Sequence, residues 1–390
     1  MTWSPSRPDV DPTPMKIESA ELYELTLPLK EPFAISGGVM RERRSLIVAL
    51  HDGEGHVGYG ESPPFELPFY SGETLASARD LLERVLLPRV IAKTFEQPED
   101  VDAVLVPGIR GNRFARAGLE TAAWDLEADR RRTGVAALVA ERLGVSPAGS
   151  IQCGIALGIP DDRRSESLAR SVEEAVHEGY RRVKIKVAPG WDVVPAQAVR
   201  QVLTGTEIPL TADANGAYEW PEHEPNLRGL DELGLLYLEQ PLGPEELVGH
   251  ARLGRLLRTP ICLDETLHDA GWARQVIELE GPKVWNLKVH RVGGLTEAIR
   301  VYREATSYGA KLWAGTMPES GIGSQADLAM AALPGFVYPS DLEPSTRWYG
   351  RNVDVIKLVM GADGRMAVPS SSVGKLLDPG RFRAATKRLL

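Results

Sequence analysis

The sequence has few cysteines, no long hydrophobic run and no basic run, and each shortage excludes a class of protein. Its 390 residues include two cysteines, Cys153 and Cys262, which are too few for a disulfide framework. No stretch approaches the roughly 18 consecutive apolar residues of a membrane span. The opening "MTWSPSRPDVDPTP" also lacks the apolar core of a secretory signal. We therefore expect a cytoplasmic protein with free thiols and no membrane partner.

The charge balance is acidic, with 54 Asp and Glu residues against 45 Lys and Arg residues and a net charge of −9. This balance excludes a general nucleic-acid binder and suits a metal site. Hydrophobic residues make up 43% and charged residues 25%, which is typical of a globular chain. The four prolines among the first fourteen residues predict a disordered lead-in over 1–14.

The first part of the chain predicts an α+β domain over residues 15–145. Alternating apolar and polar residues at 17–29 and 45–62 predict strands, and the "DGEG" turn predicts that the second run is a hairpin. We expect a loop over 30–44. Helical periodicity follows at 72–93 and 114–143.

From about residue 151 a repeat begins, in which short apolar runs end at polar residues and helical stretches follow. One position near the end of each run gives 156, 186, 213, 239, 264, 288, 314 and 340, which are 24 to 30 residues apart. Eight strand–helix units of this size predict an α/β fold with a (β/α)₈-type barrel over 146–364. An open doubly wound sheet is the alternative, but the units show no break at a switch point. We expect residues 365–390 to return to the N-terminal domain.

The strand ends carry the chemistry, because the carboxyl ends of barrel strands form the active-site face. The polar residues at these ends are Lys184, Lys186, Asp213, Glu239, Asp264, Glu265 and Lys288. Carboxylates from three consecutive units suit a hard cation such as Mg²⁺, with Mn²⁺ as an alternative. Asp213 or Asp264 taken alone could be a helix N-cap, whereas three carboxylates at equivalent strand-end positions favour a metal site.

Strands two and six of an eight-stranded barrel lie opposite each other, so Lys186 and Lys288 face each other across these carboxylates. That arrangement suits removal of an α-proton from a carboxylate substrate on one face and delivery on the other. We expect burial and the neighbouring amine of Lys184 to lower the pKa of the Lys186 base. Lys184 taken alone is equally consistent with a lysine that buries its apolar stem and keeps its amine in solvent, or with a lysine in a salt bridge.

The segments "KIKVAPGWD", "ADANGAY", "LEQPL", "ICLDE", "NLKVHRVGGL" and "GTMPESGIG" resemble the muconate-lactonizing subgroup of the enolase superfamily. Within it they most resemble the N-succinylamino acid (N-acylamino acid) racemase and o-succinylbenzoate synthase group. The resemblance implies an acid/base pair (Lys186 and Lys288), a supporting Lys184, Mg²⁺ ligands (Asp213, Glu239 and Asp264) and supporting residues around them (Asn215 and Glu265). It also implies that the N-terminal domain is a cap whose loops near 30–40 and 62–71 read the substrate.

Substrate contacts follow from the resemblance less directly. The candidates are Phe33, Ile35 and Phe65 in the cap, and Ala156, Met317, Glu319 and Gly321 on the barrel. For any one of the cap residues, ordinary packing is the competing reading. Three departures lie near the substrate: Ala156 stands where serine is usual, Ser324 stands where arginine is usual, and residues 340–349 read "SDLEPSTRWY".

The sequence thus predicts a racemase or epimerase of an N-acyl or N-succinyl amino acid, with o-succinylbenzoate synthase chemistry available through the same enediolate. Muconate-type cycloisomerisation and dipeptide epimerisation are the nearest alternatives. A Schiff-base aldolase would use either lysine covalently. A barrel that only binds a carboxylate is disfavoured because binding needs one lysine. We expect a small-molecule carboxylate partner and a homo-oligomer.

Overall fold

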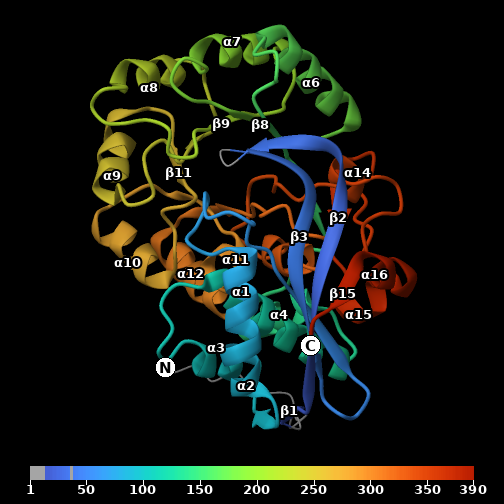
Figure 1. Cartoon of the computed structure of the whole chain (residues 1–390). Coiled ribbons are helices and arrows are strands. Elements are labelled where there is room, and N and C mark those ends of the chain that lie inside the picture. The colour runs from blue at the N-terminus through green and yellow to red at the C-terminus, as the bar shows by residue number, and fades with distance from the viewer. Residues whose placement is uncertain (1–13, 36–37) are drawn as a thin grey trace.

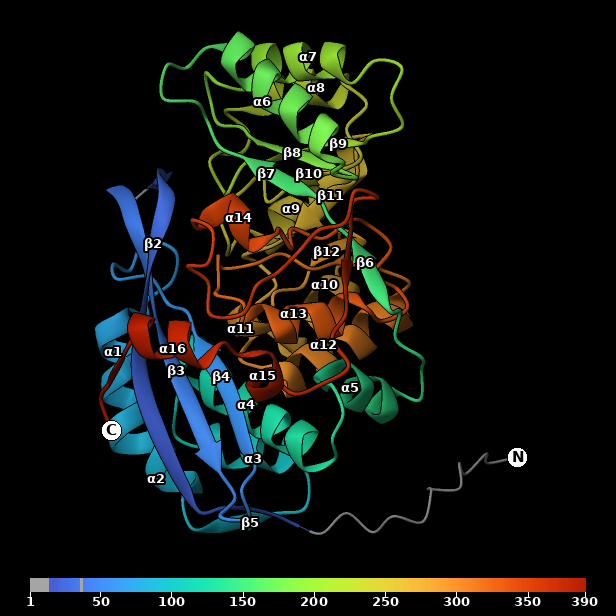
Figure 2. The same cartoon turned by 90° about the vertical axis from the view of Figure 1, so that its right-hand side faces the viewer.

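The computed structural model describes residues 14–35 and 38–390, so most of the lead-in predicted for 1–14 lies outside the described residues. A cap built on an antiparallel sheet packs against a barrel of parallel strands (Figure 1). Both views place the blue cap sheet beside the orange helices of the barrel, with the green helices at the far end (Figure 2). No helix among the described residues combines the length and apolar character needed to cross a membrane.

The cap sheet has the strand order β15-β2-β3-β4. The cap elements are β1 (Met15–Ile17), β2 (Ser19–Ile35), β3 (Gly38–His51), β4 (Val57–Ser62), α1 (Leu75–Leu81), a π-helical turn (Leu82–Leu86), α2 (Leu87–Val90), β5 (Lys93–Phe95), α3 (Glu99–Leu105), α4 (Arg113–Arg130) and α5 (Val135–Leu143). Helix α4 lies directly on β4, because Gly60 and Gly118 let the two backbones approach. A Cβ atom on Gly60 would lie 2.2 Å from the Gly118 oxygen.

One sequence expectation for the cap was wrong. The predicted loop over 30–44 is largely strand, since β2 continues to Ile35 and β3 starts at Gly38, with a register shift between Pro28 and Phe33. The helical periodicity at 114–143 is confirmed, as two helices, α4 and α5, that residues 131–134 separate. Gly134 packs against the C-terminal segment, where a Cβ would lie 2.5 Å from the Pro369 oxygen.

The barrel sheet comprises seven parallel strands among the described residues, in the order β13-β12-β11-β10-β9-β8-β7. These strands are β7 (Ile155–Leu157), β8 (Val183–Lys186), β9 (Leu210–Asp213), β10 (Leu238–Glu239), β11 (Ile261–Leu263), β12 (Val284–Asn286) and β13 (Lys311–Trp313). The helices around them are α6 (Ser165–Glu178), α7 (Val193–Val202), α8 (Glu224–Asp231), α9 (Leu247–Leu256), α10 (Ala270–Glu278), α11 (Val289–Val292), α12 (Leu295–Tyr308), α13 (Ser324–Ala331) and α14 (Ser345–Trp348).

The eighth predicted strand forms bridges rather than a regular strand, and it joins the two edges of the sheet. On one side, the Val337 amide donates to the Leu312 oxygen at 3.0 Å and the Asp341 amide to the Ala314 oxygen at 2.9 Å. On the other side, the Gly154 amide donates to the Ser340 oxygen at 2.7 Å. The eighth unit therefore closes the ring of strand ends, while the short α14 takes the place of a full eighth helix.

The C-terminal segment contains β14 (Arg365–Ala367), α15 (Val373–Leu376), α16 (Pro379–Ala385) and β15 (Thr386–Arg388). Strand β14 pairs with the short β6 (Ser150–Gln152) below the barrel. Strand β15 pairs antiparallel with β2, so the last residues form an edge of the cap sheet.

Candidate active site

The three predicted metal ligands occupy one level at the carboxyl ends of adjacent strands. Asp213 ends β9, Glu239 ends β10 beside it in register, and Asp264 directly follows β11. All three side chains are buried. Parallel strands in register bring their ends to one edge, which explains why residues 25 or more positions apart in sequence meet here.

Each of these carboxylates accepts a hydrogen bond from a predicted lysine. The Nζ–oxygen distances are 2.7 Å for Lys186 to Asp213, 2.9 Å for Lys184 to Glu239 and 2.9 Å for Lys288 to Asp264. The structure therefore brings the three lysines and three carboxylates together. Lys186 enters from β8 and Lys288 from beyond β12, with β9, β10 and β11 between them.

Asn215 and Glu265 extend this network, as the resemblance implied. Lys186 Nζ donates to Asn215 Oδ1 at 2.5 Å, and Asn215 Nδ2 donates to Glu265 Oε1 at 2.9 Å. The Asn215 amide also donates to Asp213 Oδ1 at 3.0 Å. One asparagine thus orients a lysine and two carboxylates.

Charge compensation, rather than burial alone, sets the protonation of the buried groups. Burial favours a neutral Lys184, but Asp341, Glu239 and Asp213 outweigh it and raise the pKa of Lys184. Burial is likewise outweighed at Asp213, where Lys186 and Lys184 lower the pKa to about 2. At Glu239 burial and the nearby Asp213 raise the pKa.

Lys288 behaves like Lys184. Its burial is outweighed by the surrounding acidic groups, Tyr70, Glu265, Glu239 and Asp213, which raise its pKa. The sequence-based expectation of a lowered pKa was made for Lys186. At Lys184 and Lys288 the neighbouring acidic groups raise the pKa and favour the ammonium form.

Sequence reasoning missed two polar groups inside the barrel. Asn286 donates from Nδ2 to Glu239 Oε1 at 2.8 Å, and Asp341 Oδ2 lies 2.7 Å from Lys184 Nζ. Asn286 is two residues before Lys288 on the same strand face, and Asp341 follows the eighth run as Asp213 follows the third. Strand alternation and the repeat could have indicated both residues.

Tyr70 and Arg291 also lie at the site, and neither strand alternation nor the repeat could have indicated them. Tyr70 reaches from the cap and places its hydroxyl 3.5 Å from Lys288 Nζ. Arg291 contacts Asp264 Oδ1 and donates from Nη2 to the Asn286 backbone oxygen at 2.7 Å.

The predicted substrate contacts lie around this centre to different degrees. Ala156 pairs with Lys184 across β7 and β8, and its amide donates to Glu343 Oε1 at 3.1 Å. Phe65 is half-buried in a cap loop beside Phe69, with ring centroids 4.6 Å apart.

Met317, Glu319 and Gly321 share the loop after β13, where the Met317 amide donates to Glu319 Oε1 at 2.9 Å. The side chains of Phe33 and Ile35 lie outside the described part of the structure. Only their backbone is described, as part of β2.

The donor chemistry of Asp213, Glu239 and Asp264 fits a divalent cation. They are buried carboxylates on consecutive strands, and their oxygens converge at one edge of the sheet, where Lys186, Lys184, Lys288 and Arg291 balance their charge. Carboxylate oxygens are the ligands that hard divalent cations prefer.

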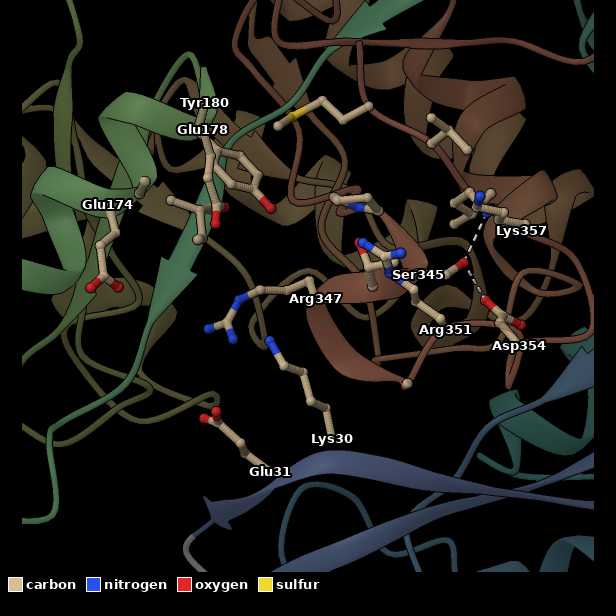
Figure 3. A pocket seen from close by; sticks show the side chains of 18 of the residues that line it. Lys30, Glu31, Glu174, Glu178, Tyr180, Ser345, Arg347, Arg351, Asp354 and Lys357 are labelled. Carbon is tan, nitrogen blue, oxygen red and sulfur yellow. Dashed lines mark hydrogen bonds between the residues drawn. The ribbon is translucent and has the colours of Figure 1, made fainter. Parts of the chain in front are cut away.

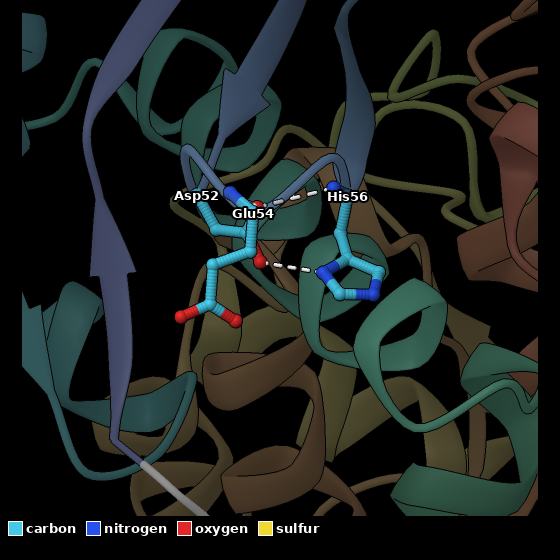
Figure 4. A group of neighbouring side chains, drawn as sticks. All are labelled: Asp52, Glu54 and His56. Carbon is cyan, nitrogen blue, oxygen red and sulfur yellow. Dashed lines mark hydrogen bonds and ion pairs between the residues drawn. The ribbon is translucent and has the colours of Figure 1, made fainter.

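Two other clusters hold potential ligand atoms within 4.8 Å of one another, and neither contains these three residues. The first is Asp52, Glu54 and His56 in the β3–β4 turn (Figure 4). There Asp52 accepts from the Glu54 and His56 amides and pairs with the His56 ring, so the cluster is explained by turn geometry. The second is His290, Glu319 and Asp327, in which His290 Nδ1 lies 3.1 Å from Glu319 Oε1 and 3.5 Å from Asp327 Oδ2.

The second cluster is fully buried. Burial is outweighed by the two carboxylates, which raise the pKa of His290 to about 10. His290 is therefore an imidazolium between two carboxylates, one of which, Glu319, belongs to the loop after β13.

A cavity of about 960 Å³ lies outside the barrel, between α6 and the segment from Pro344 to Met360 (Figure 3). Ile155 and Leu157 line it, whereas Ala156 between them faces Lys184, so the cavity is on the outer side of β7. Lys30 and Arg347 point into it, and Glu174 and Glu178 stand on the opposite wall. None of the predicted catalytic or metal residues lines this cavity.

Comparison with known proteins agrees with this architecture. Residues 18–140 match the mandelate racemase / muconate lactonizing enzyme N-terminal domain, and residues 167–374 match the enolase C-terminal domain-like family. These two domains in tandem define an enzyme of the enolase superfamily. The chain belongs to its mandelate racemase / muconate lactonizing enzyme family.

Among its relatives is an N-succinylamino acid racemase of Thermus thermophilus, 43% identical over 355 residues, which are 91% of this chain and 93% of the relative. An o-succinylbenzoate synthase of Geobacillus stearothermophilus is 38% identical over 339 residues, 87% and 88% of the two chains. The solved dipeptide epimerase of Cytophaga hutchinsonii, in complex with Mg and the dipeptide D-Ala-L-Val, has a TM-score of 0.85, 23% identity and coverage of 96% and 99%. This last likeness shows the shared fold.

Proposed function

We propose that this enzyme racemises an N-acylated amino acid, with an N-succinyl group as the acyl group, by moving the α-proton between Lys186 and Lys288. The observation that carries the proposal is the placement of these amines on opposite sides of three buried carboxylates. The racemase relative at 43% identity supports the substrate class.

Asp213, Glu239 and Asp264 would hold Mg²⁺, or Mn²⁺ in its place. A divalent cation supplies charge that stabilises the enediolate formed when the α-proton leaves a carboxylate substrate. The chain itself provides hard oxygen ligands, and Asn286 and Asn215 orient two of them through hydrogen bonds.

In this mechanism the neutral amine of one lysine takes the α-proton from one face of the substrate. The ammonium group of the other lysine gives a proton to the opposite face, which inverts the configuration. For the opposite enantiomer the roles exchange. The carboxylates that keep Lys288 ionised must have their charge engaged before it can act as a base.

Lys184 has a different task in this proposal. Its amine lies 2.9 Å from Glu239 and 2.7 Å from Asp341, and its side chain is 4% exposed. It therefore compensates buried negative charge beside the reacting centre and does not transfer the proton.

A second candidate activity is o-succinylbenzoate synthesis, since dehydration also begins with α-proton removal and the relative at 38% identity has that name. Loss of the proton and of a β-hydroxyl would require only one of the two lysines to act as base. Muconate-type cycloisomerisation and dipeptide epimerisation would use the same geometry, and the solved muconate lactonizing enzyme and dipeptide epimerase that share the fold are 22% and 23% identical to this chain.

The test is α-proton exchange in D₂O with N-succinyl amino acids of each configuration. We expect deuterium to enter the α-position of both enantiomers with the native enzyme, and EDTA to stop exchange until Mg²⁺ is restored. Lys186→Ala should lose exchange from one enantiomer and Lys288→Ala from the other. Lys311→Ala is the matched control, because this exposed lysine begins β13 at the opposite end of the barrel.

Equal exchange of both enantiomers in both lysine variants would refute the assignment. Borohydride trapping of substrate with activity insensitive to EDTA would instead support the Schiff-base aldolase. Turnover of 2-succinyl-6-hydroxy-cyclohexadiene carboxylate by the same enzyme samples measures the synthase activity.

We also place the enzyme in the cytoplasm. Cys153 and Cys262 are both free and buried, which is the arrangement expected in a reducing compartment. Fractionation of the source cells with an antibody to the chain tests this placement.

A further inference from the structure

Arg43 is a buried cation from the cap that the mechanism above does not use. It lies on β3, its residue surface is 2% exposed, and the hydrogen-bond partners of its guanidinium are backbone oxygens. Burial lowers the pKa of this guanidinium. A charge held in this way is costly, so its hydrogen bonds must be specific to these positions.

The backbone oxygens belong to two separate loops. On the cap side, Nη1 donates to the Pro64 oxygen at 3.1 Å and Nη2 donates to the Pro63 oxygen. On the barrel side, Nε donates to the Pro318 oxygen at 3.0 Å and Nη2 to the Met317 oxygen at 3.3 Å. One planar group thus joins the cap loop after β4 to the loop after β13.

Proline at three of these four positions makes the arrangement stiffer. Pro63, Pro64 and Pro318 have no amide hydrogen to place in a competing bond, and the rings of Pro63 and Pro64 restrict the backbone of the cap loop. The guanidinium fork can bind several oxygens in a fixed plane, which an ammonium group cannot do.

Glu61 supports the barrel loop next to this point. Its carboxylate accepts from the Ser320 amide at 3.1 Å, the Ser320 hydroxyl at 2.5 Å and the Gly323 amide at 2.9 Å. Glu61 lies in β4 of the cap, and it is also the acidic group whose charge most offsets the burial of the Arg43 guanidinium. Both residues therefore link the cap to the barrel loop, and Arg43 in addition binds the backbone oxygens of the cap loop.

Both loops reach the reacting centre. The Arg43 guanidinium lies 4.9 Å from the centroid of the Phe65 ring, which packs 6.1 Å from the ring of Tyr70. The Tyr70 hydroxyl lies 3.5 Å from Lys288 Nζ. The barrel loop follows Gly315, whose amide donates at 2.8 Å to Oδ1 of Asn286, the residue that binds Glu239, and the loop carries Met317, one of the Arg43 partners.

We propose that Arg43 is a positioning residue that ties the cap loop of residues 63–70 to the barrel loop of residues 316–321, so that the two loops close over the substrate as one unit. The inference about catalysis rests on the proposed function, whereas the coupling of the loops does not. Arg43 touches no reacting atom and acts through Phe65, Tyr70 and Met317.

The first test follows hydrogen exchange, which requires no substrate. In Arg43→Met, amides in both loops should exchange about tenfold faster or more, because loss of one hydrogen bond to a charged donor corresponds to that factor. Glu61→Gln should speed exchange at the Ser320 and Gly323 amides, which donate to its carboxylate. Arg41→Met is the matched control, since Arg41 lies two residues earlier on β3 and is exposed. Unchanged exchange in either loop of Arg43→Met would overturn the proposal.

The second test measures steady-state kinetics with N-succinyl amino acids. We expect Arg43→Met to lower kcat/KM by about 10- to 100-fold, as for misplacement of reacting groups, with Mg²⁺ affinity unchanged. Arg43→Lys should recover little of the loss, because an ammonium cannot span both loops. Added guanidinium should partly restore Arg43→Ala, but should not change Arg41→Ala.

Full activity of Arg43→Met would overturn the catalytic part of the proposal, and so would full rescue by Arg43→Lys. A native enzyme inactive on these substrates would refute the proposed function instead, and the exchange experiment would still decide whether the loops are coupled.

Discussion

Replacing Asp341 by asparagine removes a negative charge that contacts two buried cations. The Asp341 carboxylate contacts the Arg182 guanidinium and lies 2.7 Å from Lys184 Nζ. Arg182 is completely buried, and Lys184 nearly so. Asparagine keeps the shape of the side chain but leaves both cations with less compensation.

Removal of one partner of a buried ion pair costs about 3–5 kcal/mol of stability. We expect Asp341→Asn to lower the free energy of unfolding by an amount in that range, measured from urea transitions at pH 7. Asp161→Asn is the control, because Asp161 is exposed, and we expect it to change stability by less than about 0.5 kcal/mol.

The difference in unfolding free energy between the native enzyme and Asp341→Asn should also depend on pH. Burial opposes ionisation of Asp341, but Arg182 and Lys184 outweigh it and hold its pKa well below the usual range. The folded state therefore gains stability from this group above the unfolded pKa of about 3.9, and loses it as the pH falls toward the folded value. The unfolding free energies of the native enzyme and Asp341→Asn should therefore become more similar below about pH 4. Equal urea midpoints for Asp341→Asn and Asp161→Asn at pH 7 would refute the reasoning.

Two further predictions concern backbone fit and thiol chemistry. Gly321→Ala should lower both stability and activity, because a Cβ at this position would lie 2.1 Å from the Ile356 oxygen, whereas Gly72→Ala meets no atom within 4 Å and should be neutral in the same thermal and kinetic assays. Burial raises the pKa of Cys153 to about 12 and that of Cys262 well above its usual value. A thiol reagent should therefore titrate both only on unfolding, and rapid modification of the native protein would contradict this.

The strand-end residues could be predicted from the sequence because their contacts follow from a repeat. Asp213 and Glu239 are neighbours since parallel strands of equal phase must place their ends side by side. The same rule extends to Asn286, on the face of Lys288, and to Asp341, after the eighth run. The sequence pattern therefore contains a signal for both residues.

The cap contacts could not be predicted in this way. Tyr70 meets Lys288 across 218 positions of sequence, and Arg43 meets Pro318 across 275. No period relates these pairs, because they depend on how one folded unit docks on another. The extension of β2 to Ile35 was missed for a related reason: strand pairing overrode the loop character of the Gly- and Arg-containing segment.

The two lysines of β8 show how position along one strand face separates two chemical tasks. Lys184 and Lys186 point the same way, yet the Lys184 side chain is 4% exposed and lies within 3.4 Å of three carboxylates, whereas Lys186 is 30% exposed and contacts Asp213 and Asn215. An amine surrounded by three buried carboxylates stays protonated and cannot accept a proton. The amine nearer the open end of the strand is exposed enough to meet a substrate, and in the proposed mechanism it is the one that exchanges the α-proton. The deeper lysine compensates the charge of the buried carboxylates.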